Sequence, residues 1–591
     1  MTSTAYRLTS TLLLLLAAAL MLLAAPAFGA PNFRSAKVRA NVPVVSSGYY
    51  TLPEANQTVW QAGIIQGVVG GIPARTSHVT NAVTSFGADP TGASDAQAAI
   101  TSAISATPSN GTVYLPAGRY RLNADPGTKT GVTIRGAGMT NTIITNNGVF
   151  TAFSKDVSTL STFNNLYKAH EVTAGLTKGS TNISVTWNPT MYGIAPGHAI
   201  MIGGWCSTNQ TDNPLFMNVV GEFNTNSMFS IPLRSIHVCI STNASGLTFW
   251  PPLALNYPTH YNNRVAPHST VPGGAQEGQR LQMFGLEDLT IDCRRGGIGN
   301  GISWIGVEYC WLKNVRILFP QNRAILIQDS HHIEITGCEL RMDPAIAANH
   351  AGLEVDNLAF SYVYNNLIVD SFPAVQNNSG IANIFAYNFM WRNDYADTIV
   401  GSHNAGHSAM NLWEGNIANR TKIGDGYNGS AGPETYFRNW FHGANSNNAP
   451  ADAIITKRFT RGGLVVANVI GKTNQSPTYS QLSEPFGTPN VGNTNYTLPA
   501  APPWADWLGG GKNNGSWQEL DTNAAPTIVG CWNYFSNAVD TALGGQLLSN
   551  SLYLSAQPSF VWRWPLVQPT SPDFNWTNMA AGAAWTNGGW N

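Results

Sequence analysis

Charged side chains are scarce in this sequence. Lys, Arg, Asp and Glu together make up 11% of the 591 residues, and the formal net charge is −1. A protein that binds nucleic acid needs a basic surface against the phosphate backbone, so this composition argues against that class. The low charge does not indicate disorder, because 43% of the residues are hydrophobic and 18 are Trp. The sequence therefore predicts a large folded protein that does not bind nucleic acid.

Long apolar runs and closely spaced cysteines are also scarce. The one extended apolar run, residues 12–23, follows Arg7 and precedes small residues at 25–29, an arrangement typical of a secretory signal. This run is short for a membrane-spanning helix, and no second one follows. The six cysteines contain no CxxC pair of the kind that holds structural zinc. We therefore expect a secreted, extracellular or periplasmic monomer that has no membrane anchor once the signal is removed.

A repeat is the most informative feature that is present. Eight short segments end on similar corner residues, spaced 22 to 29 residues apart, and six of the eight are Asn. The corner residues are Asp288, Asn314, Cys338, Asn366, Asn388, Asn416, Asn439 and Asn468. Repeats of this length are typical of stacked units that cannot bury their apolar faces alone.

The segments between the corners predict strands rather than helices. AILIQDS, FSYVYNN, ANIFAYN and GLVVAN are short β-like runs without helical periodicity. Asn tolerates the left-handed backbone of a tight corner, and its amide can hydrogen-bond to the same amide one rung away. A column of Asn corners therefore predicts the spine of a parallel β-helix.

The N-terminal part resembles a known superfamily. The string FGADPTGASDAQAAI is followed by GTVYLPAGRYRL and GVTIRGAG. Together these resemble the opening of the pectate-lyase-like superfamily, in its rhamnogalacturonase- and epimerase-like group. The resemblance implies an all-β, right-handed parallel β-helix with an N-terminal cap helix, which the Asn corners extend to about ten coils with a small inserted β segment. The superfamily includes lyases, hydrolases, epimerases and phage tailspikes, so the resemblance leaves the chemistry open.

Breaks in the coil rhythm suggest the domain organisation. We expect a signal peptide at residues 1–29, a lead-in at 30–75, and the cap with the first coils at 76–149. An inserted β segment is expected at 150–280, central coils at 281–470, and a C-terminal coil and tail at 471–591.

Polar residues line one side of the central coils. Side chains alternate across a strand, so Ile325 and Leu353 are expected to point inward and their neighbours outward. The predicted outward set comprises Leu326, Gln328, Glu354, Asp356, Gln376, Asn378, Asn404, Tyr427, Thr456 and Arg458. Amides, carboxylates and an aromatic ring in a continuous stripe are the groups that a sugar chain requires.

Glu354 and Asp356 are the most informative pair in this stripe. As residues i and i+2 on one strand face, they are expected to lie roughly 6.5–7 Å apart. One interpretation makes them the acid and base of an inverting glycoside hydrolase. The other makes them oxygen ligands of a Ca²⁺ ion that binds a uronate. Both interpretations stay open.

Histidines near the next rungs favour a different reaction. His403 and His407 flank Asn404, and Tyr427 is in phase one rung further on. A His base and a Tyr acid are suited to β-elimination beside a uronate carboxylate. Lys457 and Arg458 are candidates for binding that carboxylate, and His350 for overhanging the same face.

The combined prediction is a secreted enzyme that cleaves an acidic polysaccharide, by β-elimination in preference to hydrolysis. A non-catalytic polysaccharide-binding or tailspike-like surface protein is the third alternative. The contiguous catalytic strings of polygalacturonases and of pectate lyases are missing from the sequence, so neither family's catalytic residues carry over.

Overall fold

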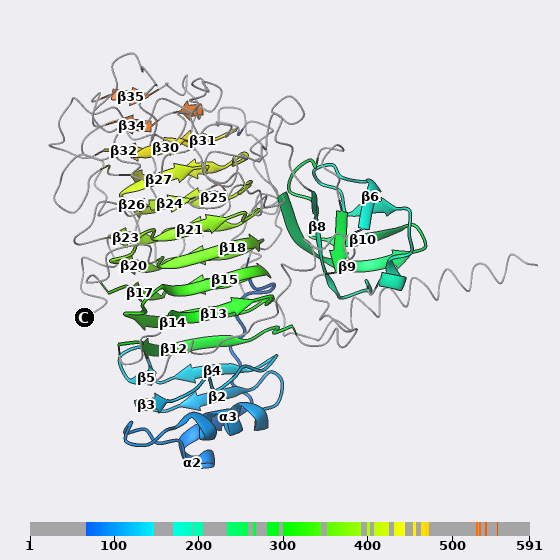
Figure 1. Ribbon diagram of the computed structural model, residues 1–591. Coiled ribbons are helices and arrows are strands. Elements are labelled where there is room, and N and C mark those ends of the chain that lie inside the picture. Colours follow the sequence, from blue (N-terminus) through cyan, green and yellow to red (C-terminus); the bar gives the residue numbers. More distant parts are fainter. Residues whose placement is uncertain are drawn as a thin grey trace, which may run out of the picture.

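The computed structural model describes residues 67–146, 170–267, 280–471 and 527–540, together with residues 52 and 552. Gaps interrupt the last three ranges, and the largest covers residues 205–232. The fold is all-β, with about nine turns of a parallel β-helix and very little helix. Figure 1 shows the turns stacked in one column with a small separate barrel beside it. The predicted fold class is confirmed, whereas the role of a helix as a cap and the exact number of coils stay predictions.

Two short helices lie at the N-terminal end of the column (Figure 1). They are α2 (Ala82–Phe86) and α3 (Gln97–Ala106). Asp95 accepts a hydrogen bond from the backbone N–H of Gln97 at 3.1 Å, which satisfies one of the free donors of the first turn of α3. Ile100, Ala103 and Ile104 of α3 are buried in the core of the first turns.

One face of the column is a seven-stranded parallel sheet. Its strands are β13 (Asn300–Ile305), β15 (Arg323–His331), β18 (Leu353–Ala359), β21 (Val375–Asn378), β24 (Ile399–Gly401), β27 (Arg420–Ile423) and β30 (Ile454–Thr456). Each strand pairs in parallel with the strand of the next turn, for example Ile325 with Leu353 and Leu353 with Val375.

The remaining strands of the column form a 22-stranded sheet, here called the long sheet. Its first strands are β1 (Val79–Asn81), β2 (Thr112–Leu115), β3 (Gly118–Leu122), β4 (Thr133–Gly136), β5 (Thr142–Asn146), β12 (Gly285–Asp292) and β14 (Trp311–Leu318). Pairs of short strands then follow, turn by turn: β16 (Glu334–Thr336) and β17 (Glu339–Arg341), β19 (Tyr362–Tyr364) and β20 (Leu367–Val369), β22 (Ile384–Ala386) and β23 (Phe389–Trp391). The last turns contribute β25 (Leu412–Glu414), β26 (Ile417–Ala418), β28 (Thr435–Phe437), β29 (Trp440–Phe441), β31 (Leu464–Val466), β32 (Val469–Ile470), β33 (Thr527–Val529), β34 (Cys531–Asn533) and β35 (Ala538–Asp540).

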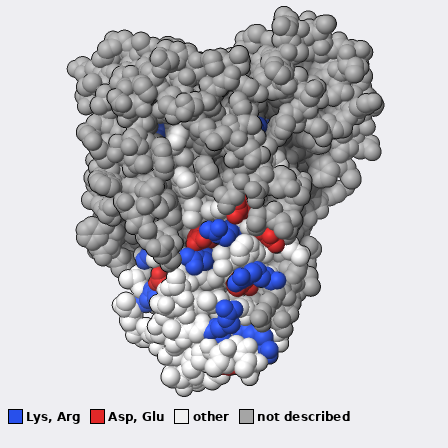
Figure 2. Space-filling view, turned by 90° about the vertical axis from the view of Figure 1, so that its left-hand side faces the viewer, with Lys and Arg blue, Asp and Glu red and all other residues white. Residues whose placement is uncertain are grey.

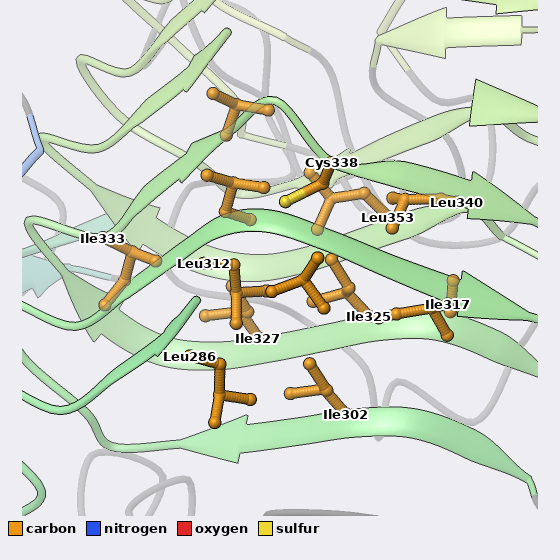
Figure 3. Packing of buried hydrophobic residues seen from close by; sticks show 14 of the residues in the cluster. Leu286, Ile302, Leu312, Ile317, Ile325, Ile327, Ile333, Cys338, Leu340 and Leu353 are labelled. Carbon is orange, nitrogen blue, oxygen red and sulfur yellow. The ribbon is translucent and has the colours of Figure 1, made fainter. Parts of the chain in front are cut away.

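The interior of the column is a continuous apolar core. Figure 3 shows Leu286, Ile302, Leu312, Ile325 and Leu353 stacked in successive turns. All five have no solvent exposure, because inward side chains of neighbouring rungs cover one another.

The predicted Asn column forms a hydrogen-bonded ladder at the corners between the paired strands. Asn388 donates its backbone N–H and its Nδ2 to Oδ1 of Asn416, at 3.0 and 2.9 Å. The same Nδ2 also donates to the carbonyl of Val363 at 3.1 Å. This arrangement recurs from Asn366 through Asn388, Asn416 and Asn439 to Asn468. The prediction that these corners stack is confirmed.

The backbone reason given for Asn at these corners is wrong for most of them. The positive φ angle lies one residue before the Asn, at Asn365, Tyr387, Gly415, Arg438 and Ala467. Only at the first two corners do the residues themselves, Asp288 and Asn314, have a positive φ. Asn is therefore used for its amide, which can donate and accept at once, and not for its tolerance of the left-handed region.

A second polar column runs parallel to the first and was not predicted. It consists of Ser361, Asn383, Asn411 and Glu434, each five residues before a corner of the Asn ladder. Asn383 donates its backbone N–H and its Nδ2 to Oδ1 of Asn411 at 2.9 and 3.0 Å. Asn411 donates in turn to Oε1 of the buried Glu434 at 2.9 Å. Burial raises the pKa of Glu434.

The separate barrel contains six strands and lies between β5 and β12 in the sequence. They are β6 (His170–Ala174), β7 (Asn182–Val185), β8 (Ala199–Gly204), β9 (Leu233–Asn243), β10 (Gly246–Trp250) and β11 (Arg264–Pro267). Its apolar core continues into the column through Phe360, Ile381 and Met410.

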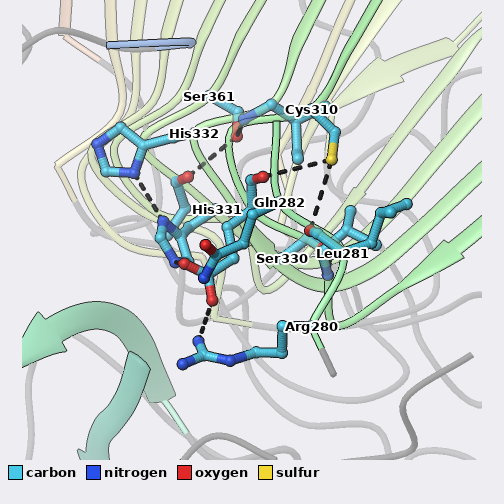
Figure 4. Close-up of polar contacts among 12 residues, drawn as sticks. Arg280, Leu281, Gln282, Cys310, Ser330, His331, His332 and Ser361 are labelled. Atoms are coloured by element: carbon cyan, nitrogen blue, oxygen red, sulfur yellow. Dashed lines mark hydrogen bonds and ion pairs between the residues drawn. The ribbon is translucent and has the colours of Figure 1, made fainter. Parts of the chain in front are cut away.

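A buried polar contact also joins the barrel to the column. Arg234 of the barrel lies 3.2 Å from Asp329 of β15. Figure 4 shows the column side of this junction, where His331 Nδ1 and His332 Nδ1 lie 2.7 Å apart. Trp250 of β10 stacks on the His332 ring at 5.1 Å between centroids. Burial holds the pKa of His332 well below its usual value, and the nearby His331 lowers it further, so this ring is neutral at the junction.

Two single residues far from the column in the sequence, Leu52 and Leu552, lie against the outer side of the long sheet. Leu52 and Leu552 are buried in one cluster with Leu412 and Leu464. Leu552 donates its backbone N–H to Glu414 at 2.9 Å. None of the helices in the described part of the chain has the length and apolar character needed to cross a membrane.

One buried side chain inside the column predicts a stabilising substitution. Asn377 on β21 points inward with no exposure, and neither polar atom of its side chain has a partner among the described residues. Its neighbours in register include Val355. An unpaired buried amide costs ~1–3 kcal/mol, so Asn377→Val should raise the free energy of unfolding by about 1 kcal/mol or more. Urea denaturation of both proteins measures this, and a destabilised variant would contradict the assignment.

Candidate functional site

The outward side of the seven-stranded sheet carries the polar stripe that the sequence predicts. Ile325, Ile327, Leu353 and Val355 lie in the core, so alternation turns the residues between them outward. Two columns result from the strand register. Gln328, Asp356 and Asn378 form one column, and Leu326, Glu354 and Gln376 form the other. Successive members of each column lie on adjacent strands, and adjacent strands are about 4.8 Å apart.

Asp356 is the central carboxyl of the first column. It accepts hydrogen bonds from Gln328 Nε2 on one neighbouring strand and from Asn378 Nδ2, at 2.6 Å, on the other. Burial, followed by the nearby Glu354 carboxylate, raises the pKa of Asp356 to about 6. The opposing amide hydrogen bonds do not cancel these effects. With a pKa of about 6, this carboxyl group carries its proton in about half of the molecules at pH 6 and can donate it.

Glu354 is in a different environment from its neighbour. Its carboxylate accepts a hydrogen bond from Nε of Arg323, with which it forms an ion pair. The pair therefore consists of one carboxylate held by an arginine and one carboxyl with a raised pKa, on the same strand face.

Asn378 adds a buried hydrogen-bond acceptor beside this pair. Its Nδ2 is used by Asp356, but its Oδ1 has no partner among the described residues. Asn378 and Gln376 are each 5% exposed. A buried carbonyl oxygen without a partner is costly, and a ligand hydroxyl would satisfy it.

The raised pKa of Asp356 predicts a pH-dependent loss of stability. The folded protein holds this proton more tightly than the unfolded chain, in which the pKa is about 4. The resulting stabilisation is fully present below about pH 4 and is lost as the pH rises through about 6. Relative to Asp356→Asn, the wild type should therefore lose free energy of unfolding between pH 4 and pH 7. Urea titrations at both pH values measure it, and a constant difference would count against the shift.

His407 lies outside the polar stripe. It is fully buried, has a positive φ of 71°, and lies just before β25. Burial lowers its pKa to about 4, so the ring is neutral at physiological pH. The predicted role of His407 as a base therefore stays a prediction that this buried position does not favour.

Six other candidates lie outside the described residues. These are His350, His403, Asn404, Tyr427, Lys457 and Arg458. The structure thus brings together Glu354, Asp356, Gln376 and Asn378 from the predicted set.

Arg323 was missed by the sequence analysis. It begins β15 two residues before the inward Ile325, so strict alternation assigns it to the core side. At the strand end its guanidinium instead reaches Glu354. The sequence did contain a signal for this contact, because an Arg beside a polar stripe with two carboxylates is expected to pair with one of them.

The predicted Ca²⁺ site is not favoured by these contacts. Arg323 already neutralises Glu354, and both carboxylates accept hydrogen bonds. Within the described residues, no group of three or more His, Cys, Asp or Glu side chains is arranged to hold a metal ion. Calcium binding stays a prediction, and none of the chemistry proposed below depends on it.

Comparison with known proteins supports the fold. The sequence pattern of the family "Rhamnogalacturonase A/epimerase, pectate lyase-like" matches residues 79–263, which is less than half of the chain. No curated protein sequence matches the chain.

Solved structures resemble the chain at low identity. The tailspike gp61 of Pseudomonas phage phi297 is 12% identical with a TM-score of 0.45, over 66% of this chain and 70% of that one. The tailspike gp49 of Pseudomonas phage LKA1 is 13% identical with a TM-score of 0.44, over 66% of this chain and 63% of that one. The A-module of the Azotobacter vinelandii mannuronan C-5 epimerase AlgE6 is 14% identical with a TM-score of 0.34, over 69% and 90%.

These likenesses are too distant to carry an argument about function. The strand stacking and the match at residues 79–263 agree with the resemblance found in the sequence. The chain is thus a parallel β-helix protein that resembles the pectate-lyase-like superfamily, with the family match confined to residues 79–263.

Proposed function

We propose that this protein is a polysaccharide-cleaving enzyme whose active site is the outward face of β15, β18 and β21. The observation that carries the proposal is the carboxyl pair. Glu354 is held by Arg323, while burial and Glu354 raise the pKa of the neighbouring Asp356. A carboxylate in an ion pair beside a carboxyl group with a raised pKa is suited to acid–base chemistry. The match to the rhamnogalacturonase A/epimerase family supports a carbohydrate as the partner.

In this proposal Asp356 is the general acid. It donates its proton to the glycosidic oxygen as the bond to the anomeric carbon breaks. Glu354 accepts a proton from the water that attacks that carbon, and two sugar products with a new reducing end result. Residues i and i+2 of a strand are about 6.5–7 Å apart, within the range of about 6.5–9.5 Å that leaves room for this water. Gln376 and the Oδ1 of Asn378, which has no partner among the described residues, bind hydroxyl groups of the substrate.

The carboxyl pair favours hydrolysis over the β-elimination that the sequence favoured. The prediction of β-elimination depended on His407 as the base and Tyr427 as the acid. His407 is buried, with its pKa lowered to about 4, and Tyr427 lies outside the described residues. An acidic substrate, with Lys457 and Arg458 as its carboxylate binders, is kept as part of the proposal.

Secretion through the signal at residues 1–29 and a monomeric state complete the proposal. A secreted enzyme meets a polysaccharide too large to enter a cell. The 11% content of charged residues and the net charge of −1 argue against nucleic acid as a competing partner.

A panel of acidic and neutral polysaccharides tests the function. Hydrolysis should produce new reducing ends without the ultraviolet absorbance of an unsaturated uronate, and a chelator should leave the rate unchanged. New reducing ends with that absorbance would replace hydrolysis by elimination. Binding without any cleavage would make the protein a polysaccharide-binding surface protein.

A further inference from the structure

Histidines gather at the junction between the barrel and the column. His331 ends β15 and His332 follows it on the column side, while His237 lies on β9 of the barrel. All three side chains are fully buried. The ring of Phe360, on the column, lies 5.7 Å from that of His332 and 5.5 Å from that of His237 between centroids. Imidazole rings therefore form part of the contact between the two units.

The neighbours of the column pair decide where its protons lie. His331 Nε2 lies 3.3 Å from Oε2 of Glu308, with which Arg280 also pairs, so this nitrogen carries a proton. In neutral His331 the other nitrogen, Nδ1, is then an acceptor, and His332 Nδ1 donates to it at 2.7 Å (Figure 4). His332 Nε2 is left as a bare lone pair, and it has no partner among the described residues.

A further proton on this pair must end on His332 Nε2. Two protons between the facing Nδ1 atoms would set one N–H group against another, so that contact holds only one. His332 is packed against the rings of Trp250, Tyr309 and Phe360, and no acceptor among the described residues reaches its Nε2. A buried charged pair with an unpaired N–H group is costly. The cost is removed when water reaches the ring, which requires Trp250 of the barrel to move away.

The barrel histidine has a complete set of hydrogen bonds in its neutral form. His237 Nδ1 lies 2.7 Å from the carbonyl oxygen of Pro251, to which it donates. Its Nε2 lies 2.6 Å from Oγ of Ser235, and this Oγ lies 2.7 Å from the hydroxyl of Tyr257. Tyr257 donates to Ser235, and Ser235 donates to His237. A proton on Nε2 would remove the acceptor of the Ser235 hydroxyl group.

The fixed charges beside the histidines are balanced. Arg280 and Glu308 form one ion pair, and Arg234 of the barrel forms another with Asp329 of β15. Tyr309 is neutral beside the column pair, because burial raises its pKa. Among the described residues of the junction, the histidines are thus the groups whose ordinary pKa lies between pH 5 and pH 8.

Docking of the barrel is linked to the protonation of these rings. Burial lowers the pKa of His237 to about 3 and holds that of His332 well below its usual value. An exposed histidine has a pKa of about 6.5, so the separated state binds more protons than the docked state. The resulting stabilisation of the docked state is fully present above about pH 6.5 and is lost as the pH falls toward the docked-state values.

We propose that the barrel–column junction is a pH-sensitive contact, and that acidification below about pH 6 separates the barrel from the column by protonating His332 and His237. The column itself should stay folded. On its side away from the barrel, acidic side chains lie beside basic ones (Figure 2), as in the ion pair of Arg316 with Glu339. Carboxyl groups ordinarily titrate near pH 4, so such pairs persist at pH 5.

The junction also adjoins the candidate functional site. Asn357 directly follows Asp356, and its Nδ2 lies 3.7 Å from Sδ of Met201 on β8 of the barrel. The same Nδ2 donates to Asp329, the partner of Arg234. Separation of the barrel would therefore uncover the edge of the outward face at Asp356.

Pulsed electron spin resonance between two spin labels measures the separation. Labelled cysteines replace Ala244, in the exposed turn after β9, and Ser85, exposed on α2 of the column. The background is Cys206→Ser, since the other five cysteines are buried. We expect one distance at pH 7.5 and a second, broader population below pH 6. Uptake of two protons should raise the ratio of separated to docked molecules about 10³-fold between pH 7.5 and pH 5.

A matched pair of variants assigns the effect to the junction. His332→Phe keeps an aromatic ring beside Trp250 but removes one proton site, so the rise should fall to about 30-fold. His78→Phe, at an exposed position just before β1, should behave as the wild type. If His332→Phe does not fold, His332→Gln takes its place, because an amide also takes up no proton.

Three results would overturn the proposal. They are label distances that stay unchanged down to pH 4.5, a His332 variant with the pH dependence of the wild type, and loss of the β-sheet circular dichroism of the column at the pH of separation.

Discussion

Asp356→Asn should lower kcat on the cleaved polysaccharide by about 10²–10⁴-fold, with little change in substrate binding. An amide keeps the size of the side chain and a carbonyl acceptor for Gln328 or Asn378. It has no ionisable proton to give to the glycosidic oxygen. Steady-state kinetics and a binding assay on the same oligosaccharide separate the two effects.

The pH dependence of the wild type should agree with this assignment. Burial and Glu354 raise the pKa of Asp356 to about 6, so turnover should fall as the pH rises above that value and the proton is lost. Asp95→Asn, an exposed carboxyl group at the start of α3, is the matched control and should retain wild-type turnover. Unchanged kinetics and an unchanged pH profile in Asp356→Asn would remove the general acid from the proposal.

Asn416→Ala should lower the free energy of unfolding by ~1–3 kcal/mol. The substitution removes an oxygen that accepts from Asn388 at 3.0 and 2.9 Å, and an Nδ2 that donates to Asn439 and to Phe385. All of these groups are buried, so water cannot replace the lost partners. Urea denaturation measures the change.

Two further variants sharpen the ladder prediction. Asn416→Asp has nearly the same shape but loses the Nδ2 donor and buries a charge, so it should be at least as destabilising. Asn123→Ala, at an exposed position after β3, should change stability by less than about 0.5 kcal/mol. A ladder variant as stable as Asn123→Ala would mean that the stacked amides contribute little to the fold.

The fold was predictable because its main signal is local and repeated. Each turn must return its polar corner to the same place, so the Asn residues recur at 22- to 29-residue intervals along the sequence. The second column carries the same signal through Asn383 and Asn411, five residues before Asn388 and Asn416. It was missed because its first and last members are different residue types: Ser361 accepts from the backbone N–H of Ile333, and Glu434 accepts from Nδ2 of Asn411.

The candidate site was predictable only as a face. Alternation placed Glu354, Asp356, Gln376 and Asn378 outside the core because strand geometry alone decides this. The state of the two carboxyl groups could not be predicted. The raised pKa of Asp356 depends first on burial, and Arg323 reaches Glu354 from a strand end where alternation no longer fixes the direction of the side chain.

A crystal structure of Asp356→Asn with a bound oligosaccharide of the cleaved polymer tests the central proposal most directly. We predict that the sugar chain lies along the outward face of β15, β18 and β21, with a glycosidic oxygen within hydrogen-bond distance of residue 356. The Oδ1 of Asn378 should accept a hydrogen bond from a sugar hydroxyl. An oligosaccharide bound elsewhere, with this face empty, would contradict the proposed site.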